Sequence, residues 1–243
     1  MPKNHILLKI KTSKDGEETA EAAVQLLSTL PKLKNNLFEK LLGKNERLSF
    51  EILVREQSIH FLINVPVRLL AYFKGAIHAS YPKAVIEEMD FDPVDYFLLE
   101  NRQLAVSSFK LKNRHYLPLK TYHDFADIDP LATLMSTLSK NEGEDTILIQ
   151  LLLATDFSFF SIDQTPSTEE LAEHPQQQLI KQKLEQRQLR AAFKIAVATD
   201  DRQKSQLLLS NIAAAYQATS RSESNELLFS KRLFLKNCFI KSM

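Results

Sequence analysis

Residues 48–66 of the chain read LSFEILVREQSIHFLINVP, and much of the fold follows from this stretch. Apolar residues occupy every second position on either side of a short polar break, at Phe50, Ile52 and Val54 and then at Ile59, Phe61, Ile63 and Val65. Period-two alternation is typical of a strand with one buried face. We therefore predict two strands joined by a tight turn at Gln57-Ser58, with Pro66 opening a helix.

The segments around this hairpin complete a β-α-β-β-α-β order. Residues 6–11 and 84–89 read as strands, and a helix is predicted before the hairpin and another after it. The first helix has Asp15 and Glu18 in capping-box spacing and an apolar stripe of Ala20, Ala23, Val24, Leu27 and Leu30. The second has a stripe of Leu69, Phe73, Ala76 and Ile77. This order is that of a ferredoxin-like unit, which we assign to residues 1–95.

The sequence of residues 96–243 predicts a second, irregular ferredoxin-like unit that begins with a basic segment. Strands are expected at 103–111, 146–155, 189–199 and 225–233. Helices are expected from Asp129-Pro130, from Thr165-Pro166 as one long Gln-rich helix to about Gln188, and from Asp200. The predicted fold class is therefore α+β, with two units of one layered plan.

A short pattern links the two units. Phe50-x-Ile52-x-Val54 recurs as Phe193-x-Ile195-x-Val197, each before an amphipathic helix and a closing strand. On this alignment the first unit has one extra hairpin strand. Any half-buried strand can carry three apolar residues at period two, so the pattern is compatible with duplication and with a shared architecture alone.

The composition excludes several classes of protein. The chain has 243 residues, a formal charge of +1, four glycines and one cysteine, Cys238. It is neither disulfide-rich nor disordered, and no apolar run approaches the ~20 residues of a bilayer span. A lone cysteine suits a reducing compartment. We therefore expect a cytoplasmic location, which includes the inner face of the membrane.

No catalytic or cofactor motif is present. Gly16, Gly43, Gly75 and Gly143 are too far apart for a phosphate-binding loop, and Cys238 has no histidine nearby. His115, His123, Asp124 and Asp127 match no metal-ligand spacing, so we expect ordinary loop side chains there. His60 and His78 are expected at the boundary of the core. We predict no enzyme activity, metal or cofactor.

Charge is segregated around residue 101. Every charged residue from Glu87 to Glu100 is acidic, and every one from Arg102 to Lys120 is basic. The candidate partner or nucleic-acid contacts are Arg102, Lys110, Lys112, Arg114, Lys120, Lys231 and Arg232. The other interpretation, which we favour, is a solvated strand face whose charges answer the acidic run. The glycine and aromatic signature of RNA-recognition domains is missing.

Several short stretches resemble one family. They are SFEI at 49–52, IHF at 59–61, ASYP at 79–82, AVIEE at 84–88, YLPLKTY at 116–122, Phe125, DPL at 129–131, LSK at 138–140, Glu144 and IQL at 149–151. Together they resemble the region before the motor of bacterial conjugative-transfer ATPases, the coupling-type proteins of type IV secretion, especially those of candidate-phylum bacteria. The resemblance runs from about Leu7 to the last strand.

This resemblance implies a non-catalytic module for assembly or docking that precedes a DNA-transfer ATPase. The motor would lie further along a longer polypeptide, so the chain as given would be a truncated piece and ATP hydrolysis is assigned to no residue here. The expected partners are proteins of the secretion or conjugation machine close to a membrane, with oligomers formed through the motor. The alternative is a stand-alone nucleic-acid-binding module that uses the basic segments 102–120 and 231–241, with DNA as its partner.

Overall fold

The computed structural model describes residues 5–12, 20–28, 48–97, 102–125, 130–139, 145–154, 166–186 and 188–232. Its strands are β1 (His5–Lys11), β2 (Leu48–Arg55), β3 (Ser58–Pro66), β4 (Val85–Met89), β5 (Gln103–Leu111), β6 (Thr146–Ala154), β7 (Arg190–Thr199) and β8 (Leu227–Arg232). Its helices are α1 (Ala20–Ser28), α3 (Leu70–Ser80), α4 (Pro130–Ser139), α5 (Thr168–Glu173), α6 (Gln177–Glu185) and α7 (Arg202–Tyr216). Short 3-10 helices are η1 (Val67–Leu69), η2 (Pro93–Phe97), η3 (Tyr122–Phe125) and η4 (Gln217–Thr219). The predicted α+β class is confirmed.

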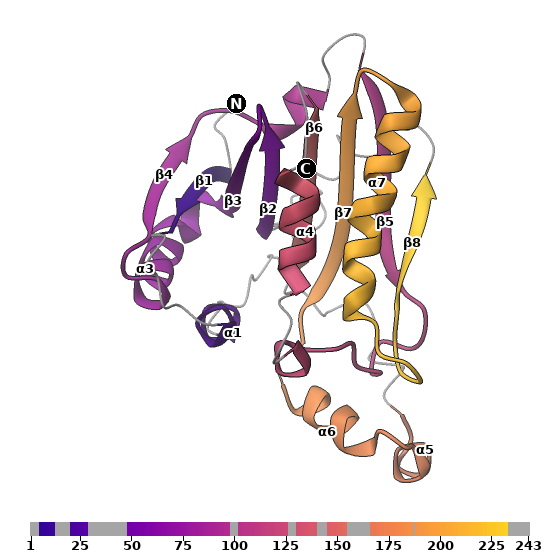
Figure 1. Ribbon diagram of the computed structural model, residues 1–243. Coiled ribbons are helices and arrows are strands. Elements are labelled where there is room, and N and C mark those ends of the chain that lie inside the picture. The colour runs from indigo at the N-terminus through magenta and orange to yellow at the C-terminus, as the bar shows by residue number, and fades with distance from the viewer. Residues whose placement is uncertain are drawn as a thin grey trace, which may run out of the picture.

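The eight strands form one sheet in the order β4-β1-β3-β2-β6-β7-β5-β8, and each described pairing is antiparallel (Figure 1). Numbered within each half and counted from its outer edge, both halves have the strand order 4-1-3-2. The halves meet where β2 pairs with β6, from Leu48 opposite Leu153 to Val54 opposite Ile147. Continuous pairing therefore joins the two predicted units into a single sheet.

The sheet corrects the alignment of the internal repeat. The Phe193 pattern lies on β7, and the strand in the equivalent position of the first half is β3, not β2. β3 carries its own copy, Phe61-x-Ile63-x-Val65, directly before η1 and α3. The predicted extra hairpin strand is therefore wrong, because β2 has its counterpart in β6. Three strands share the pattern, and only sheet position tells which two correspond.

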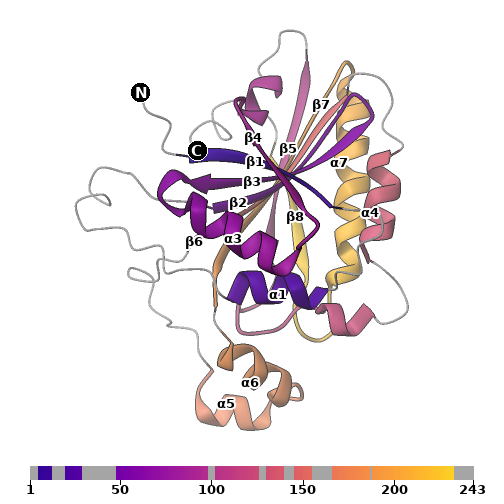
Figure 2. The ribbon, with the colours of Figure 1, turned by 90° about the vertical axis from the view of Figure 1, so that its left-hand side faces the viewer.

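Helices α1, α3, α4 and α7 pack on one face of the sheet. Leu26 of α1 and Phe73 and Ile77 of α3 form a core with the first half, and Leu134 of α4 and Ile212 of α7 form a core with the second. β2 contributes Leu48 to the first core and Val54 to the second, and residues an even number apart on a strand share a face. Both cores therefore lie on the same side, and Figure 2 shows α4 and α7 along that side of the sheet.

The opposite face has a smaller apolar cover. Leu53, Leu62 and Leu148 pack there against Val94 and Phe97 of η2. Val94 is held by its N–H, which donates to Oδ1 of Asp92 at 2.9 Å. This face is referred to below as the helix-free face, because α1, α3, α4 and α7 all pack on the other side.

The connections in equivalent places of the two halves differ. β2 and β3 are joined by Glu56 and Gln57, whose φ angles of 50° and 59° are left-handed, one residue before the predicted turn. β6 and β7 are joined by a segment that holds α5 and α6. The single long helix predicted there is wrong, because Pro175 cannot continue a helix and His174 before it is extended, with a φ of −76° and a ψ of 129°. Ser167 supplies the capping box of α5.

Two helix details also differ from the sequence analysis. The buried residue of α1 is Leu26, whereas Val24 of the predicted stripe is 47% exposed; the predicted cap at Asp15 and Glu18 lies outside the described residues. The cap of α7 is Asp201, whose Oδ2 accepts from the Lys204 N–H at 2.7 Å, rather than Asp200. The stripe of α3 is confirmed at Leu69, Phe73 and Ile77.

Candidate functional site

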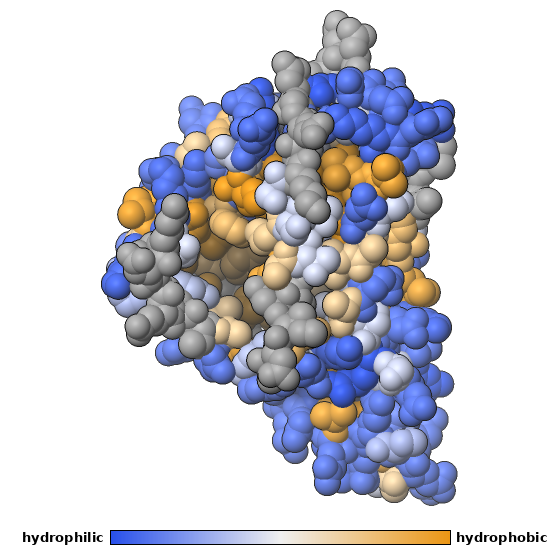
Figure 3. Space-filling model, in the orientation of Figure 1, coloured by the Kyte–Doolittle hydropathy of each residue, from blue (hydrophilic) through white to orange (hydrophobic). Residues whose placement is uncertain are grey.

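An apolar hollow of about 480 Å³ opens on the helical face. It lies between the helix pair of the first half and that of the second, and Figure 3 shows it as a recess whose walls are coloured as hydrophobic. The residues that line it are Ile10, Ala23, Leu26, Leu27, Phe50, Glu51, Ile52, Phe61, Leu62, Ile63, Ile77, Tyr81, Ile149, Leu151, Phe193 and Tyr216. We call this cavity the apolar hollow.

Among the described residues, the helical layer is interrupted above the middle of the sheet, and the hollow lies at this gap. Phe50 and Ile52 of β2 and Phe61 of β3 point to the helical face, as the alternation predicts. Phe61 nevertheless remains 46% exposed, since α3 ends at Ser80 on one side and α4 packs against the second half on the other. Phe61, a large apolar side chain on an inner strand of the sheet, is therefore left partly open to solvent.

Few polar side chains reach the apolar hollow. Tyr81 and Tyr216 each contribute a ring and a hydroxyl to its lining, and burial raises the pKa of Tyr216. Glu51 belongs to the wall, but its carboxylate is hydrogen-bonded on the helix-free side of β2: Oε1 accepts from Ser49 Oγ at 2.6 Å and from Gln150 Nε2 at 3.1 Å. Among the described residues, the hollow therefore offers contact area and no acid–base pair.

Glu51 is a feature that the sequence analysis passed over. Only 4% of the residue is exposed, its Oε2 has no hydrogen-bond partner among the described atoms, and it lies opposite Gln150 where the two halves meet. Burial raises the pKa of Glu51, and the bonds from Ser49 and Gln150 oppose this rise. The sequence signal that could have identified Glu51 is an acidic residue in the middle of a predicted strand.

The candidate basic residues do not gather into one patch. Arg102 is partly buried before β5, and Lys110 is exposed near the end of β5. Lys112 Nζ lies 3.1 Å from Glu226 Oε2, and Arg114 lies 3.9 Å from Glu170 Oε1. Lys120 Nζ lies 5.9 Å from the centre of the Phe125 ring. Lys231 and Arg232 stand on β8 opposite Ser107 and Val106, and their side chains lie outside the described part of the molecule. Lys112 and Arg114 thus each have an acidic neighbour within the chain, in ion pairs that remain largely exposed.

The acidic run does not supply these partners. Glu87 pairs with Lys11 and Glu88 pairs with Lys74, both at 2.5 Å, because β4 and β5 lie toward opposite ends of the sheet. The predicted pairing of the two charge runs is therefore wrong for Glu87, Glu88, Lys112 and Arg114. For Glu87, Lys112 and Arg114 the partner lies far away in the sequence, at Lys11, Glu226 and Glu170.

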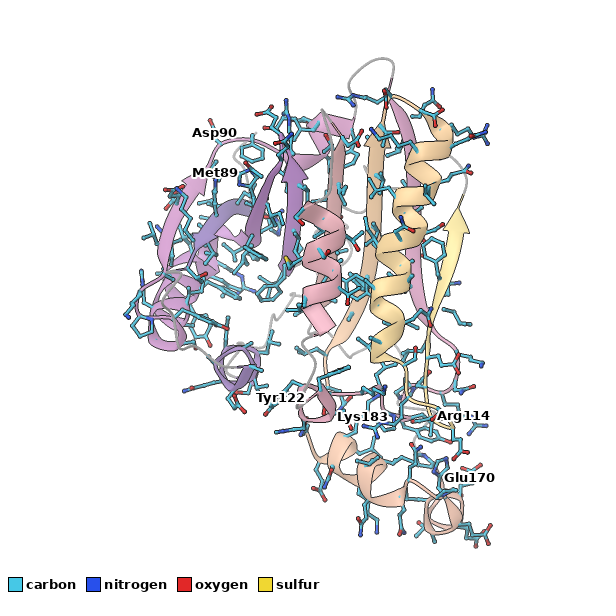
Figure 4. The ribbon with its side chains drawn as sticks, in the orientation of Figure 1. Met89, Asp90, Arg114, Tyr122, Glu170 and Lys183 are labelled. Carbon is cyan, nitrogen blue, oxygen red and sulfur yellow. The ribbon has the colours of Figure 1, made fainter. Side chains whose placement is uncertain are left out.

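The loop after β5 is built as a structural joint. Lys183 of α6 donates to the carbonyl oxygens of His115 and of Leu117, the second at 3.1 Å, and burial lowers the pKa of Lys183. Asn225 Nδ2 donates to the carbonyls of Arg114 and Leu117 at 2.9 and 3.1 Å. Figure 4 labels Arg114, Lys183 and Glu170 at this end of the molecule. No sequence pattern points to Lys183.

The histidine candidates are dispersed. Asp124 is bound by Arg221, whose guanidinium lies 2.6 Å from both carboxylate oxygens, and Asp127 lies outside the described residues. Across the described ranges, no three His, Cys, Asp or Glu side chains gather as metal ligands would. His78 is exposed on α3 and His60 is partly buried on β3. None of the helices in these ranges is long and apolar enough to cross a membrane.

The sequence model of one protein family, described as "Domain of unknown function (DUF8128)", matches residues 2–155 of the 243. The chain belongs to this family. The matched part of this DUF8128 protein contains the first half of the sheet, β5, α4 and β6, and so includes most of the residues that line the apolar hollow. No curated protein matches the sequence.

Two solved structures illustrate how remote the structural similarity is. The flavoenzyme CrmK, involved in the shunt product recycling mechanism in caerulomycin biosynthesis, aligns with 91% of this DUF8128 chain at 12% identity and a TM-score of 0.40. Aclacinomycin oxidoreductase aligns with 88% at 12% identity and a TM-score of 0.41. The aligned chain spans 44% and 40% of these two enzymes. At this level the likeness carries no inference about activity.

Proposed function

We propose that this chain is a non-catalytic docking module of a bacterial type IV secretion or conjugation machine, placed before its DNA-transfer ATPase. Its docking surface would be the apolar hollow, and its occupant an amphipathic helix of a partner protein in that machine. The chain would work on the cytoplasmic side, near the inner face of the membrane, and would oligomerise through the motor.

The observation that carries this proposal is the open apolar hollow. Contiguous exposed apolar surface of this kind usually marks an interaction site, and a side chain such as Phe61 gains free energy when it is covered. A helix is ~10 Å across, so one helix laid between the two existing pairs would continue the helical layer. Helices that bind in this way present apolar residues at i, i+3, i+4 and i+7.

The strand order of the two halves supports the module part of the proposal. Each half has the β-α-β-β-α-β order and the 4-1-3-2 sheet order of a ferredoxin-like unit, with α5 and α6 inserted in the second. We therefore propose two ferredoxin-like units, residues 1–95 and 96–243, joined at β2 and β6. The sequence resemblance to the region before conjugative motors supports the machine part.

The first test is the genetic context. The coding sequence beyond codon 243 and the neighbouring genes should encode a Gly-x-x-x-x-Gly-Lys-Ser/Thr motif, the phosphate-binding loop of the motor. A context with no such ATPase would overturn the link to DNA transfer.

The second test measures docking with the other proteins of that machine, encoded by the neighbouring genes and each purified separately. Isothermal titration should give a dissociation constant that Phe61→Glu weakens at least about tenfold, since a carboxylate would be buried without a partner. Val85→Glu is the matched control: Val85 is 55% exposed on β4 and lies outside the hollow. If Phe61→Glu binds as tightly as Val85→Glu and as the natural chain, docking at the hollow is contradicted. If both variants bind much more weakly than the natural chain, the loss comes from added negative charge in general.

A further inference from the structure

A second cavity, of about 270 Å³, lies on the helix-free face, on the other side of the sheet from the apolar hollow. Its floor comes from three neighbouring strands: Lys9 of β1 stands opposite Leu62 of β3, and Leu53 of β2 stands opposite His60 of β3. Met89 closes one side at the end of β4, where Figure 4 labels it. We call this cavity the cationic pocket.

The polar lining holds two cations, Lys9 and Arg55, together with His60 and Ser58. Among the described residues that line the pocket, Glu56 is the one carboxylate. Glu56 lies 3.1 Å from Arg55, but its side chain is 72% exposed and so neutralises the pocket weakly. Lys11, the other cation near His60, is paired with Glu87.

The charged groups around the pocket act on the pKa of His60, although burial has the largest effect on it. Burial lowers the pKa of His60, and the positive charge of Lys9 lowers it further. Glu56 raises this pKa, and Lys11 lowers it by the smallest contribution of the four. Cations already present therefore oppose a further positive charge, and a bound anion would relieve that repulsion.

The remaining wall of the pocket is aromatic. Phe91 and Tyr96 have ring centres 5.6 Å apart, and the Arg55 guanidinium lies 3.9 Å from the centre of the Tyr96 ring. Stacking holds the guanidinium plane in place while leaving its edge able to donate hydrogen bonds. The cavity is slightly smaller than the ~300–1,000 Å³ typical of ligand sites, so it has room for about one ring and one anionic group.

We propose that the cationic pocket binds a small aromatic oxyanion, with its phosphate or carboxylate between Lys9 and Arg55 and its ring against Phe91 and Tyr96. Both cations are suited to the anionic group: a lysine is a point charge, and an arginine binds two oxygens with parallel N–H groups. This site is on the opposite face from the apolar hollow, so it neither requires docking nor depends on the proposed machine.

The test is an NMR titration of the intact chain with phenyl phosphate, benzoate and inorganic phosphate. His60 is one of six histidines, and its imidazole signal is identified as the one removed by His60→Gln. Phenyl phosphate or benzoate should raise the pKa of His60 and saturate near about 1 mM or below. Inorganic phosphate should bind at least about tenfold more weakly, because it lacks the ring.

Variants separate this site from general anion binding. Lys9→Gln should weaken phenyl phosphate at least about tenfold, and Phe91→Leu should reduce its advantage over inorganic phosphate. Lys74→Gln is the control, because Lys74 pairs with Glu88 and does not line the pocket. The proposal is overturned if none of the three anions shifts the His60 signal, if Lys74→Gln weakens binding as much as Lys9→Gln, or if inorganic phosphate binds as tightly as phenyl phosphate.

Discussion

Phe61 and Phe193 occupy equivalent positions in the two halves of the sheet but have different surroundings. Phe193 packs against Phe109 and Tyr216, with ring centres 4.8 and 4.7 Å away. Phe61 has Ile10 and Ile52 as its strand neighbours and remains 46% exposed at the apolar hollow. One pattern on equivalent strands thus yields a partly buried residue packed against the core in one half and a residue that is about half exposed in the other.

The helix above each strand explains the difference. α7 has 15 residues and brings Tyr216 over Phe193, whereas α3 has 11 residues and ends before it can cover Phe61. The first half therefore has apolar surface at Phe61 that is not buried within its own core. In a docking module this is the surface that a partner would cover.

The largest expected effect comes from truncating these two side chains separately. Phe193→Ala should lower the free energy of unfolding by about 3 kcal/mol, because it removes contacts between three rings. Phe61→Ala should cost less than about 1 kcal/mol. Urea denaturation followed by circular dichroism measures both. Equal losses would mean that Phe61 is covered in solution and would remove the comparison.

Glu51 tests the joint between the halves. Its folded-state pKa is raised, so it contributes stability at low pH that is lost as pH rises through that value. Glu51→Gln should remove this loss. The variant should therefore gain on the natural chain as pH rises from 5 to 8, with a slope of at most about 1.4 kcal/mol per pH unit.

The matched control for this experiment is Glu87→Gln, at an exposed carboxylate whose pKa is lowered by Lys11. It should not gain on the natural chain as pH rises. A Glu51→Gln difference that stays constant between pH 5 and 8 would contradict a buried carboxyl with a raised pKa.

The Asp124–Arg221 ion pair is a contact within the second half, and a substitution of Asp124 tests its contribution to stability. Asp124→Asn should cost about 1 kcal/mol, since it removes a two-oxygen contact that is partly shielded from water. The Thr121 N–H and Arg221 lower the pKa of Asp124, so the contribution is present above the ordinary aspartate range and is lost in acid. Thermal unfolding at pH 7 and pH 3 should show the difference shrinking at pH 3. An unchanged difference would mean that charge is not involved.

The turn between β2 and β3 tests the short connection of the first half. Gln57 has a φ of 59°, which glycine adopts without a steric penalty, so Gln57→Gly should stabilise the chain by up to about 1 kcal/mol. Ser58→Gly, in the adjoining strand, is the control and should destabilise slightly. A loss of stability in Gln57→Gly would show that chain entropy outweighs strain at this turn.

The smallest effect is expected from nucleic acid. Because Lys112 and Arg114 are already paired, single-stranded DNA should bind no more tightly than about 10⁻⁴–10⁻⁶ M at physiological salt. Lys110→Glu should change this affinity less than about threefold. Fluorescence anisotropy across a salt series measures it. Tighter binding with a steep salt dependence would favour the nucleic-acid module and would make the second half the functional one.

The strands and the helix α3 could be predicted because their signals are local. Alternation at 48–66 identifies β2 and β3, and the stripe of Leu69, Phe73 and Ile77 identifies the buried face of α3. The end of a helix at Pro175 could also be predicted, since a proline cannot continue a helix. The prediction of one long helix rested on the Gln-rich composition instead. The choice of repeat partner was not local, since β2, β3 and β7 carry the same three residues.

The charge pairing could not be read from the chain in any comparable way. Lys112 meets Glu226 and Arg114 meets Glu170 because the loop after β5 folds against the turn before β8 and against α5. Because the acidic and basic runs are neighbours in the sequence, they suggested that the two runs pair with each other. An ion pair needs only proximity in space, and a sheet order of 4-1-3-2 separates segments that are adjacent in sequence.

Composition and local periodicity were sufficient for the α+β class, most of the strands and the absence of a phosphate loop, because each depends on residues close together in the chain. The apolar hollow, the buried carboxylate of Glu51 and the cationic pocket depend on which strands become neighbours and where each helix stops. Those are outcomes of packing among residues far apart in sequence, such as Ile10 and Tyr216, which are 206 positions apart and line one hollow. Only the tertiary structure could decide them.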